Sequence, residues 1–67
     1  MNVLKLRARM VERGINVEGL AAIIDIDRSS MYRKLNDGDK ITIGEAQRIK
    51  TALELTPEDA ASIFLSE

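Results

Sequence analysis

Signals that start helices recur at four places in the chain and divide it into short segments. Asn16 and Asp27 are good N-cap residues, because their side-chain oxygens accept hydrogen bonds from the free amides of a first helical turn. Thr42 opens a capping box, and Thr56 repeats the signal with a proline at the first helical position after it. A chain interrupted this often cannot form long helices, so we expect several short helices that pack together.

Hydrophobic residues recur at three- and four-residue steps between these signals, which is the period of an amphipathic helix. Gly14 ends the first helix, since glycine adopts the left-handed conformation after a helix at little cost. Asp25 interrupts the pattern between the second and third helices, and aspartate tolerates the same conformation. The expected helices cover residues 2–13, 17–24, 28–36, 43–54 and 57–65.

The first helix has two hydrophobic rows that together predict a wide apolar face. Val3, Leu6 and Met10 form one row, and Leu4, Ala8 and Val11 form the other. Lys5, Arg9 and Arg13 lie on the opposite side at four-residue steps, which predicts that they face solvent. Arg7 falls near the middle of the apolar face, and the sequence assigns it no role.

Disulfide bonds and metal sites built on thiolate or imidazole ligands are excluded, because the 67-residue chain has no cysteine and no histidine. The same absence excludes catalysis by a Cys–His pair or a Ser–His triad, so we expect neither an enzyme nor a metal or cofactor. Hydrophobic residues make up 45% of the chain and aromatic residues only 3%, so aliphatic side chains must form the core. We expect one all-α domain over residues 1–67, with no membrane span.

Charge is distributed unevenly along the chain although its net value is only −1. Residues 1–34 carry seven Lys/Arg against four Asp/Glu, and residues 35–67 carry three against seven. Such a difference between the halves of a sequence indicates a face that is suited to an anionic partner.

Residues 16–36 hold the most informative hydrophobic pattern. Leu20 and Ala21 are followed by Ile24, Met31 and Leu35, and the small Ala21 fits where two helices cross closely. This pattern resembles the helix-turn-helix of the Cro and phage-repressor family, also called the XRE family. The resemblance extends along nearly the whole chain, and it implies a five-helix, lambda-repressor-like DNA-binding domain with the helix-turn-helix as helices two and three.

The chain departs from the family pattern at several positions. Asp25 replaces the usual turn glycine, and Val17 stands where many members have a glutamine that contacts phosphate. Met10 and Leu35 occupy the positions of a common arginine–glutamate pair. Because packed aliphatic residues can replace a partly buried ion pair without loss of stability, we predict that these two side chains touch.

The third helix of this family enters the major groove of DNA, where its outward side chains read base edges. With Met31 and Leu35 pointing inward, a helical wheel directs Ser29 and Arg33 outward, and the resemblance adds Arg28 and Tyr32. The alternatives are a solvated basic face and a tyrosine packed against the domain. The expected base-reading residues are Arg28, Ser29, Tyr32 and Arg33. The expected phosphate contacts are Asn16, Ser30, Asn36, Lys40 and Thr42.

The resemblance implies a transcriptional regulator that represses by occupying a palindromic double-stranded DNA operator as a homodimer. It places the protein in the bacterial cytoplasm, encoded by a phage or another mobile element, with no small-molecule ligand. Ile63, Phe64 and Leu65 form either a lid over the core or the dimer contact. The acidic second half and the missing glutamine at position 17 favour one alternative: an antirepressor or other protein-interaction module with the same fold.

Overall fold

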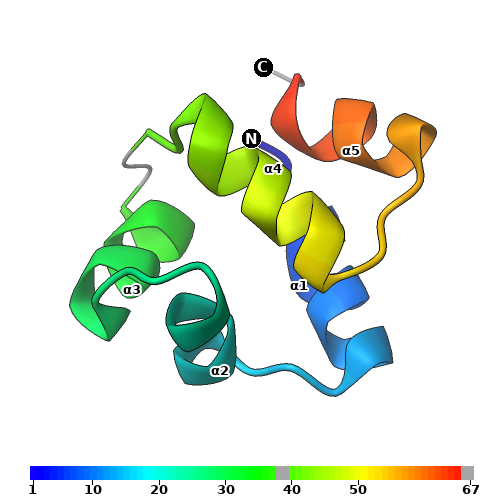
Figure 1. Ribbon diagram of the computed structural model, residues 1–67. Coiled ribbons are helices and arrows are strands. Elements are labelled where there is room, and N and C mark those ends of the chain that lie inside the picture. The colour runs from blue at the N-terminus through cyan, green and yellow to red at the C-terminus, as the bar shows by residue number, and fades with distance from the viewer. Residues whose placement is uncertain (38–39, 66–67) are drawn as a thin grey trace.

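The computed structural model describes residues 1–37 and 40–65, and this part of the chain forms five helices and no strand (Figure 1). The helices are α1 (Val3–Arg13), α2 (Val17–Ile23), α3 (Arg28–Asn36), α4 (Ile43–Ala52) and α5 (Pro57–Phe64). The predicted all-α fold is therefore confirmed, and α3 has the predicted bounds. The other helices differ from prediction only at their terminal residues.

Each predicted cap is present. Asn16 Oδ1 accepts from the Gly19 amide at 2.7 Å, and Asp27 Oδ2 accepts from the Ser29 amide at 3.0 Å. Thr42 and Glu45 form the reciprocal capping box that starts α4. Local hydrogen bonds therefore fix where these helices begin, independently of how the helices pack.

The helices surround one aliphatic core. In Figure 1, α4 crosses the centre of the molecule in front of α1, with α2 and α3 on one side and α5 on the other. Met10 and Leu35 are both buried, at 4% and 5% exposure, so the core extends to the positions where the family usually has an ion pair. Their direct contact stays a prediction. The fully buried large side chains are Leu6, Leu20, Ile24, Met31, Ile49, Leu53 and Ile63.

The predicted apolar face of α1 is wrong in one row. Leu6 and Met10 are buried, but Leu4 is 83% exposed and Val11 79% exposed, and Ala8 between them is exposed as well. A helix can turn only one side toward the core, and the row of Leu6 and Met10 occupies it. The other row lies on the outside of the domain.

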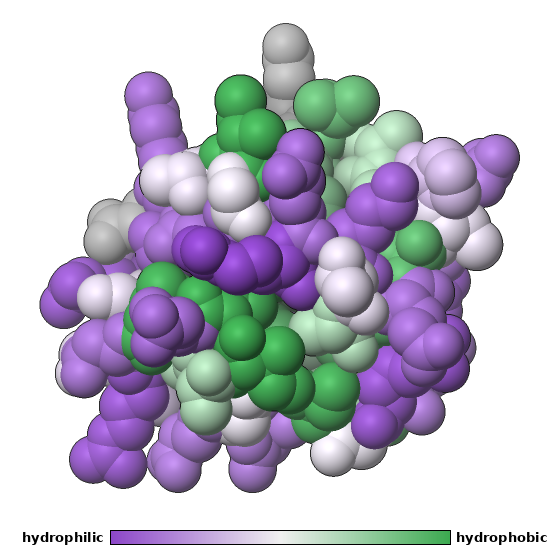
Figure 2. Space-filling view, in the orientation of Figure 1, coloured by the Kyte–Doolittle hydropathy of each residue, from purple (hydrophilic) through white to green (hydrophobic). Residues whose placement is uncertain are grey.

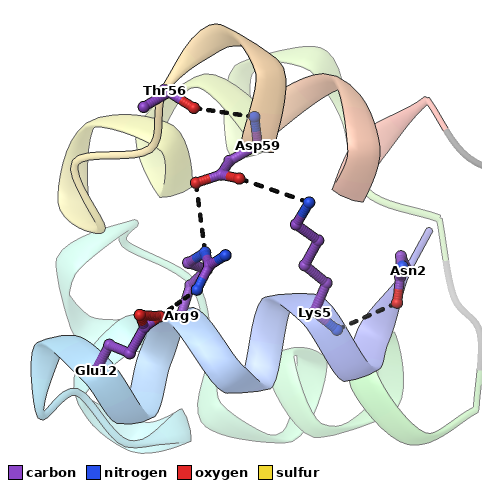
Figure 3. Close-up of polar contacts among 6 residues, drawn as sticks. All are labelled: Asn2, Lys5, Arg9, Glu12, Thr56 and Asp59. Carbon is purple, nitrogen blue, oxygen red and sulfur yellow. Dashed lines mark hydrogen bonds and ion pairs between the residues drawn. The ribbon is translucent and has the colours of Figure 1, made fainter.

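The prediction that Lys5, Arg9 and Arg13 face solvent is also wrong for the first two. Lys5 Nζ lies 3.5 Å and Arg9 Nε 3.3 Å from the Asp59 carboxylate of α5 (Figure 3). Arg9 also pairs with Glu12 in its own helix. Arg13 is exposed, yet its Nε donates to the carbonyl oxygen of Leu53 at 2.9 Å. The two ion pairs to Asp59 join α1 to α5, and the Arg13 hydrogen bond joins the end of α1 to the C-cap residue of α4.

Candidate nucleic-acid interface

A tight turn joins α2 to α3. Asp25 has a φ of 60°, the left-handed conformation that the sequence allowed, and it reverses the chain after Ile24. The Ile26 amide donates to the Ala21 carbonyl at 3.0 Å and secures the turn. Ala21 is only 2% exposed, as expected of a small residue where two helices cross. Ile23 is 52% exposed, because α2 turns Leu20 and Ala21 inward.

One side of α3 is buried and the opposite side is open. Met31 and Leu35 enter the core, as the helical wheel assumed. Hydrophilic side chains project from the side of the molecule that α2 and α3 form (Figure 2). Tyr32 is 41% exposed, so its ring is partly packed and partly available. The four expected base-reading residues are all exposed: Arg28, Ser29, Tyr32 and Arg33.

Both arginines of this side have polar neighbours. Arg28 Nη1 lies 3.6 Å from Glu18 Oε1 of α2, and both side chains are well exposed. An exposed ion pair of this kind is worth about 0–1 kcal/mol, so Arg28 can leave Glu18 at little cost. Arg33 Nη2 donates to the Ser30 hydroxyl one turn earlier at 3.1 Å. Asp27 is engaged as the N-cap of α3, which agrees with its expected structural role.

Four of the five expected phosphate contacts already use their side chains in hydrogen bonds within the protein. Asn16 and Thr42 use their side-chain oxygens as helix caps, but the Asn16 amide nitrogen and the Thr42 hydroxyl hydrogen stay able to donate. Ser30 is half-buried and accepts from Arg33. Asn36 and Lys40 are exposed, one at the end of α3 and the other before α4.

The structure gives Arg7 a partner that the sequence did not reveal. Its Nη2 donates to Oδ1 of Asn36 at 2.7 Å and connects the middle of α1 to the last residue of α3. Only the tertiary arrangement brings these residues together, because 29 positions separate them in the sequence.

Lys34 and Glu45 form a second connection that sequence reasoning missed. Lys34 Nζ lies 3.4 Å from Glu45 Oε1, and the two side chains are only 14% and 11% exposed. Lys34 also donates to the Lys40 carbonyl at 3.0 Å. The hydrogen bond from the Thr42 amide lowers the pKa of Glu45; burial opposes this effect, and Lys34 adds to it. Glu45 is therefore ionised at neutral pH, and its ion pair with Lys34 ties α3 to α4.

The three residues of the possible dimer contact have different environments. Ile63 is fully buried and belongs to the core, so it is not available to a second copy of the chain. Phe64 is half-buried, and Leu65 is 80% exposed. Together with Ile43, Phe64 and Leu65 line a groove of about 630 Å³ between α4 and α5. Figure 2 shows hydrophobic surface at this end of the molecule, where α4 begins and α5 ends.

The described residues contain no cluster of three or more acidic side chains placed to hold a metal ion. Within the same part of the chain, no helix is long and apolar enough to cross a membrane.

The tight turn, the buried crossing at Ala21 and the open polar side of α3 define a helix-turn-helix DNA-binding domain. The chain belongs to the Cro/C1-type helix-turn-helix DNA-binding family, whose sequence model matches residues 5–64. This membership confirms the family resemblance and supports a DNA-binding regulator. Comparisons with curated proteins and with solved structures gave no match to the chain.

Proposed function

We propose that the protein is a sequence-specific transcriptional regulator that inserts α3 into the major groove of DNA. The observation that carries the proposal is the exposed surface of α3, where Ser29 and Arg33 lie opposite the buried Met31 and Leu35 and where Arg28 and Tyr32 are exposed as well. Arginine donates two hydrogen bonds to guanine O6 and N7, and serine and tyrosine suit base edges, phosphates or thymine methyl groups. Arg33, on the side away from the core, is the principal base-reading residue.

Phosphate contacts surround this helix in the proposed complex. Asn16, Ser30, Asn36, Lys40 and Thr42 provide donors on the flanks of α3. Few of these are cations, so the affinity of one domain is modest. Binding falls as the salt concentration rises, because each neutralised phosphate releases counterions.

A homodimer gives this domain a second half-site. Phe64 and Leu65 offer apolar surface to a second copy, and the groove between α4 and α5 adjoins them. In Figure 1, α5 lies away from α3, so a two-fold contact through α5 leaves both recognition helices free. Such a dimer binds a palindromic operator with half-sites one helical turn of DNA apart and represses transcription by blocking polymerase.

The test begins with selection of duplexes from a random-sequence DNA pool, followed by fluorescence anisotropy on the best duplex and on an unrelated one. Arg33→Ala is expected to weaken binding to the selected duplex about ten- to a hundredfold, since a bidentate base contact contributes about 1–3 kcal/mol. Binding to the unrelated duplex changes little. Arg48→Ala, which removes an exposed arginine of α4, is the matched control for charge.

Equal affinity of the wild-type protein for all duplexes would refute sequence-specific recognition. If the protein binds no DNA but binds a repressor protein, the antirepressor function replaces the proposed one.

A further inference from the structure

The contact between Arg7 and Asn36 lies beside the proposed DNA interface. Arg7 is half-buried on α1, and Asn36 is the exposed last residue of α3. Their hydrogen bond, 2.7 Å from Arg7 Nη2 to Asn36 Oδ1, is the contact that the structure gives between their side chains. This hydrogen bond therefore anchors the Asn36 side chain at the end of α3.

The chemistry of the two groups determines which way the Asn36 amide faces. A guanidinium group has only donors, whereas a side-chain amide has an acceptor oxygen and a donor nitrogen. Arg7 can therefore be satisfied only by Oδ1 of Asn36. The amide nitrogen, with its two hydrogens, must then point away from Arg7.

An asparagine without such a partner can present either end of its amide to DNA. The oxygen repels a phosphate, and the nitrogen donates to it. Arg7 removes this ambiguity, and it also places a permanent positive charge next to the amide. The pair consequently presents only donors, which is the chemistry that a phosphate oxygen requires.

We propose that Arg7 is a positioning residue of the DNA interface that holds the Asn36 amide ready to donate to a backbone phosphate. The inference rests on the proposed function and adds to it a residue of α1, outside the helix-turn-helix. A phosphate contact carries no sequence information, so the pair strengthens binding to every duplex and fixes the end of α3 against the backbone.

Asn36→Asp separates this role from a purely structural one. The new carboxylate still accepts from Arg7, now as a charge-assisted hydrogen bond, and this gain offsets the cost of a negative charge at the C-terminus of α3, so the melting temperature stays close to the wild-type value. The same carboxylate repels phosphate, so binding is expected to weaken at least tenfold on the selected and on the unrelated duplex alike. Asn2→Asp is the matched control, because it makes the same replacement at the N-cap of α1 and keeps the cap.

Arg7 is tested by two further variants in the same anisotropy assay. Arg7→Gln introduces a side chain that both donates and accepts, so it no longer fixes the amide, and binding is expected to weaken about three- to tenfold on both duplexes. Arg7→Lys restores a donor-only partner and recovers most of that loss. In the Asn36→Ala background, Arg7→Gln is expected to reduce the DNA affinity clearly less than it does in the wild type, because the amide that Arg7 positions is gone.

Two results would overturn the inference. One is Asn36→Asp binding both duplexes within twofold of the Asn2→Asp control. The other is a loss of affinity in the Arg7 variants that follows a loss of melting temperature. The Arg33→Ala result distinguishes this failure from that of the proposed function: if wild type discriminates between the duplexes and Arg33→Ala does not, DNA recognition stands even when the Arg7 inference falls.

Discussion

Replacing Glu45 by glutamine tests how α3 is held against the rest of the domain. Glutamine can still accept the hydrogen bond from the Thr42 amide, since a capping box works with either residue. The substitution therefore removes the negative charge that faces Lys34 and leaves the helix start intact. We expect α3 to be attached less firmly to α4.

The size of the effect follows from the burial of the pair. Exposed ion pairs contribute about 0.2–1 kcal/mol, and breaking a fully buried pair costs about 3–5 kcal/mol. The Lys34 and Glu45 side chains are 14% and 11% exposed, and Lys34 keeps its hydrogen bond to the Lys40 carbonyl. We therefore expect a loss of about 2 kcal/mol, which lowers the melting temperature of a domain this small by roughly 8–16 °C.

Acid weakens the wild-type protein through the same residue. The pKa of Glu45 in the folded state lies below its ordinary value of 4.5, so the unfolded chain binds the proton more readily. The stabilisation is fully present above that ordinary value and is lost as the pH falls through the folded-state pKa. Because glutamine does not titrate, the difference between wild type and Glu45→Gln is expected to shrink over this acid range.

Urea unfolding followed by far-UV circular dichroism, from neutral pH into this acid range, measures both effects. Glu58→Gln is the matched control, because it removes the same charge from an exposed position on α5. A Glu45→Gln variant as stable as the control at neutral pH would refute the assigned role of the pair. A difference that does not change with pH would refute the role of ionisation.

Two further predictions concern α5. Asp59→Ala removes the partner of Lys5 and Arg9, and is expected to lower the melting temperature by a few degrees at low salt and by less at high salt; a loss that does not depend on salt would contradict it. Leu65→Glu is expected to convert the proposed dimer to a monomer in analytical ultracentrifugation at micromolar concentration, whereas Leu4→Glu, at similar exposure, leaves the dimer intact. Equal behaviour of the two leucine variants would exclude α5 as the dimer contact.

The α3 part of the candidate site was largely predictable from the sequence. Asp27 fixes the start of α3, and the helical period together with Met31 and Leu35 then determines which side is open. Ser29 and Arg33 follow from those positions alone, whereas Arg28 and Tyr32 were added by the family resemblance. Their roles at DNA come from the family and stay proposals.

Contacts between distant segments were not predictable. Three side-chain contacts join residues far apart in the chain: the Arg7–Asn36 hydrogen bond and the Lys34–Glu45 and Arg9–Asp59 ion pairs. Two hydrophobic rows of α1 predicted one wide apolar face, but the structure buries only the row of Leu6 and Met10. N-caps and hydrophobic periodicity describe one helix at a time, and neither indicates which other helix packs against it.

The sequence by itself therefore determined the helices, their N-caps, the left-handed turn at Asp25 and the open side of α3. These features depend on hydrogen bonds and conformational preferences within a few residues. Only the tertiary structure decided how α1 is rotated, that Leu4 and Val11 lie outside, and that Arg7 reaches the end of α3. Those outcomes depend on filling one small core and pairing charges across it, which is settled only when all the helices pack together.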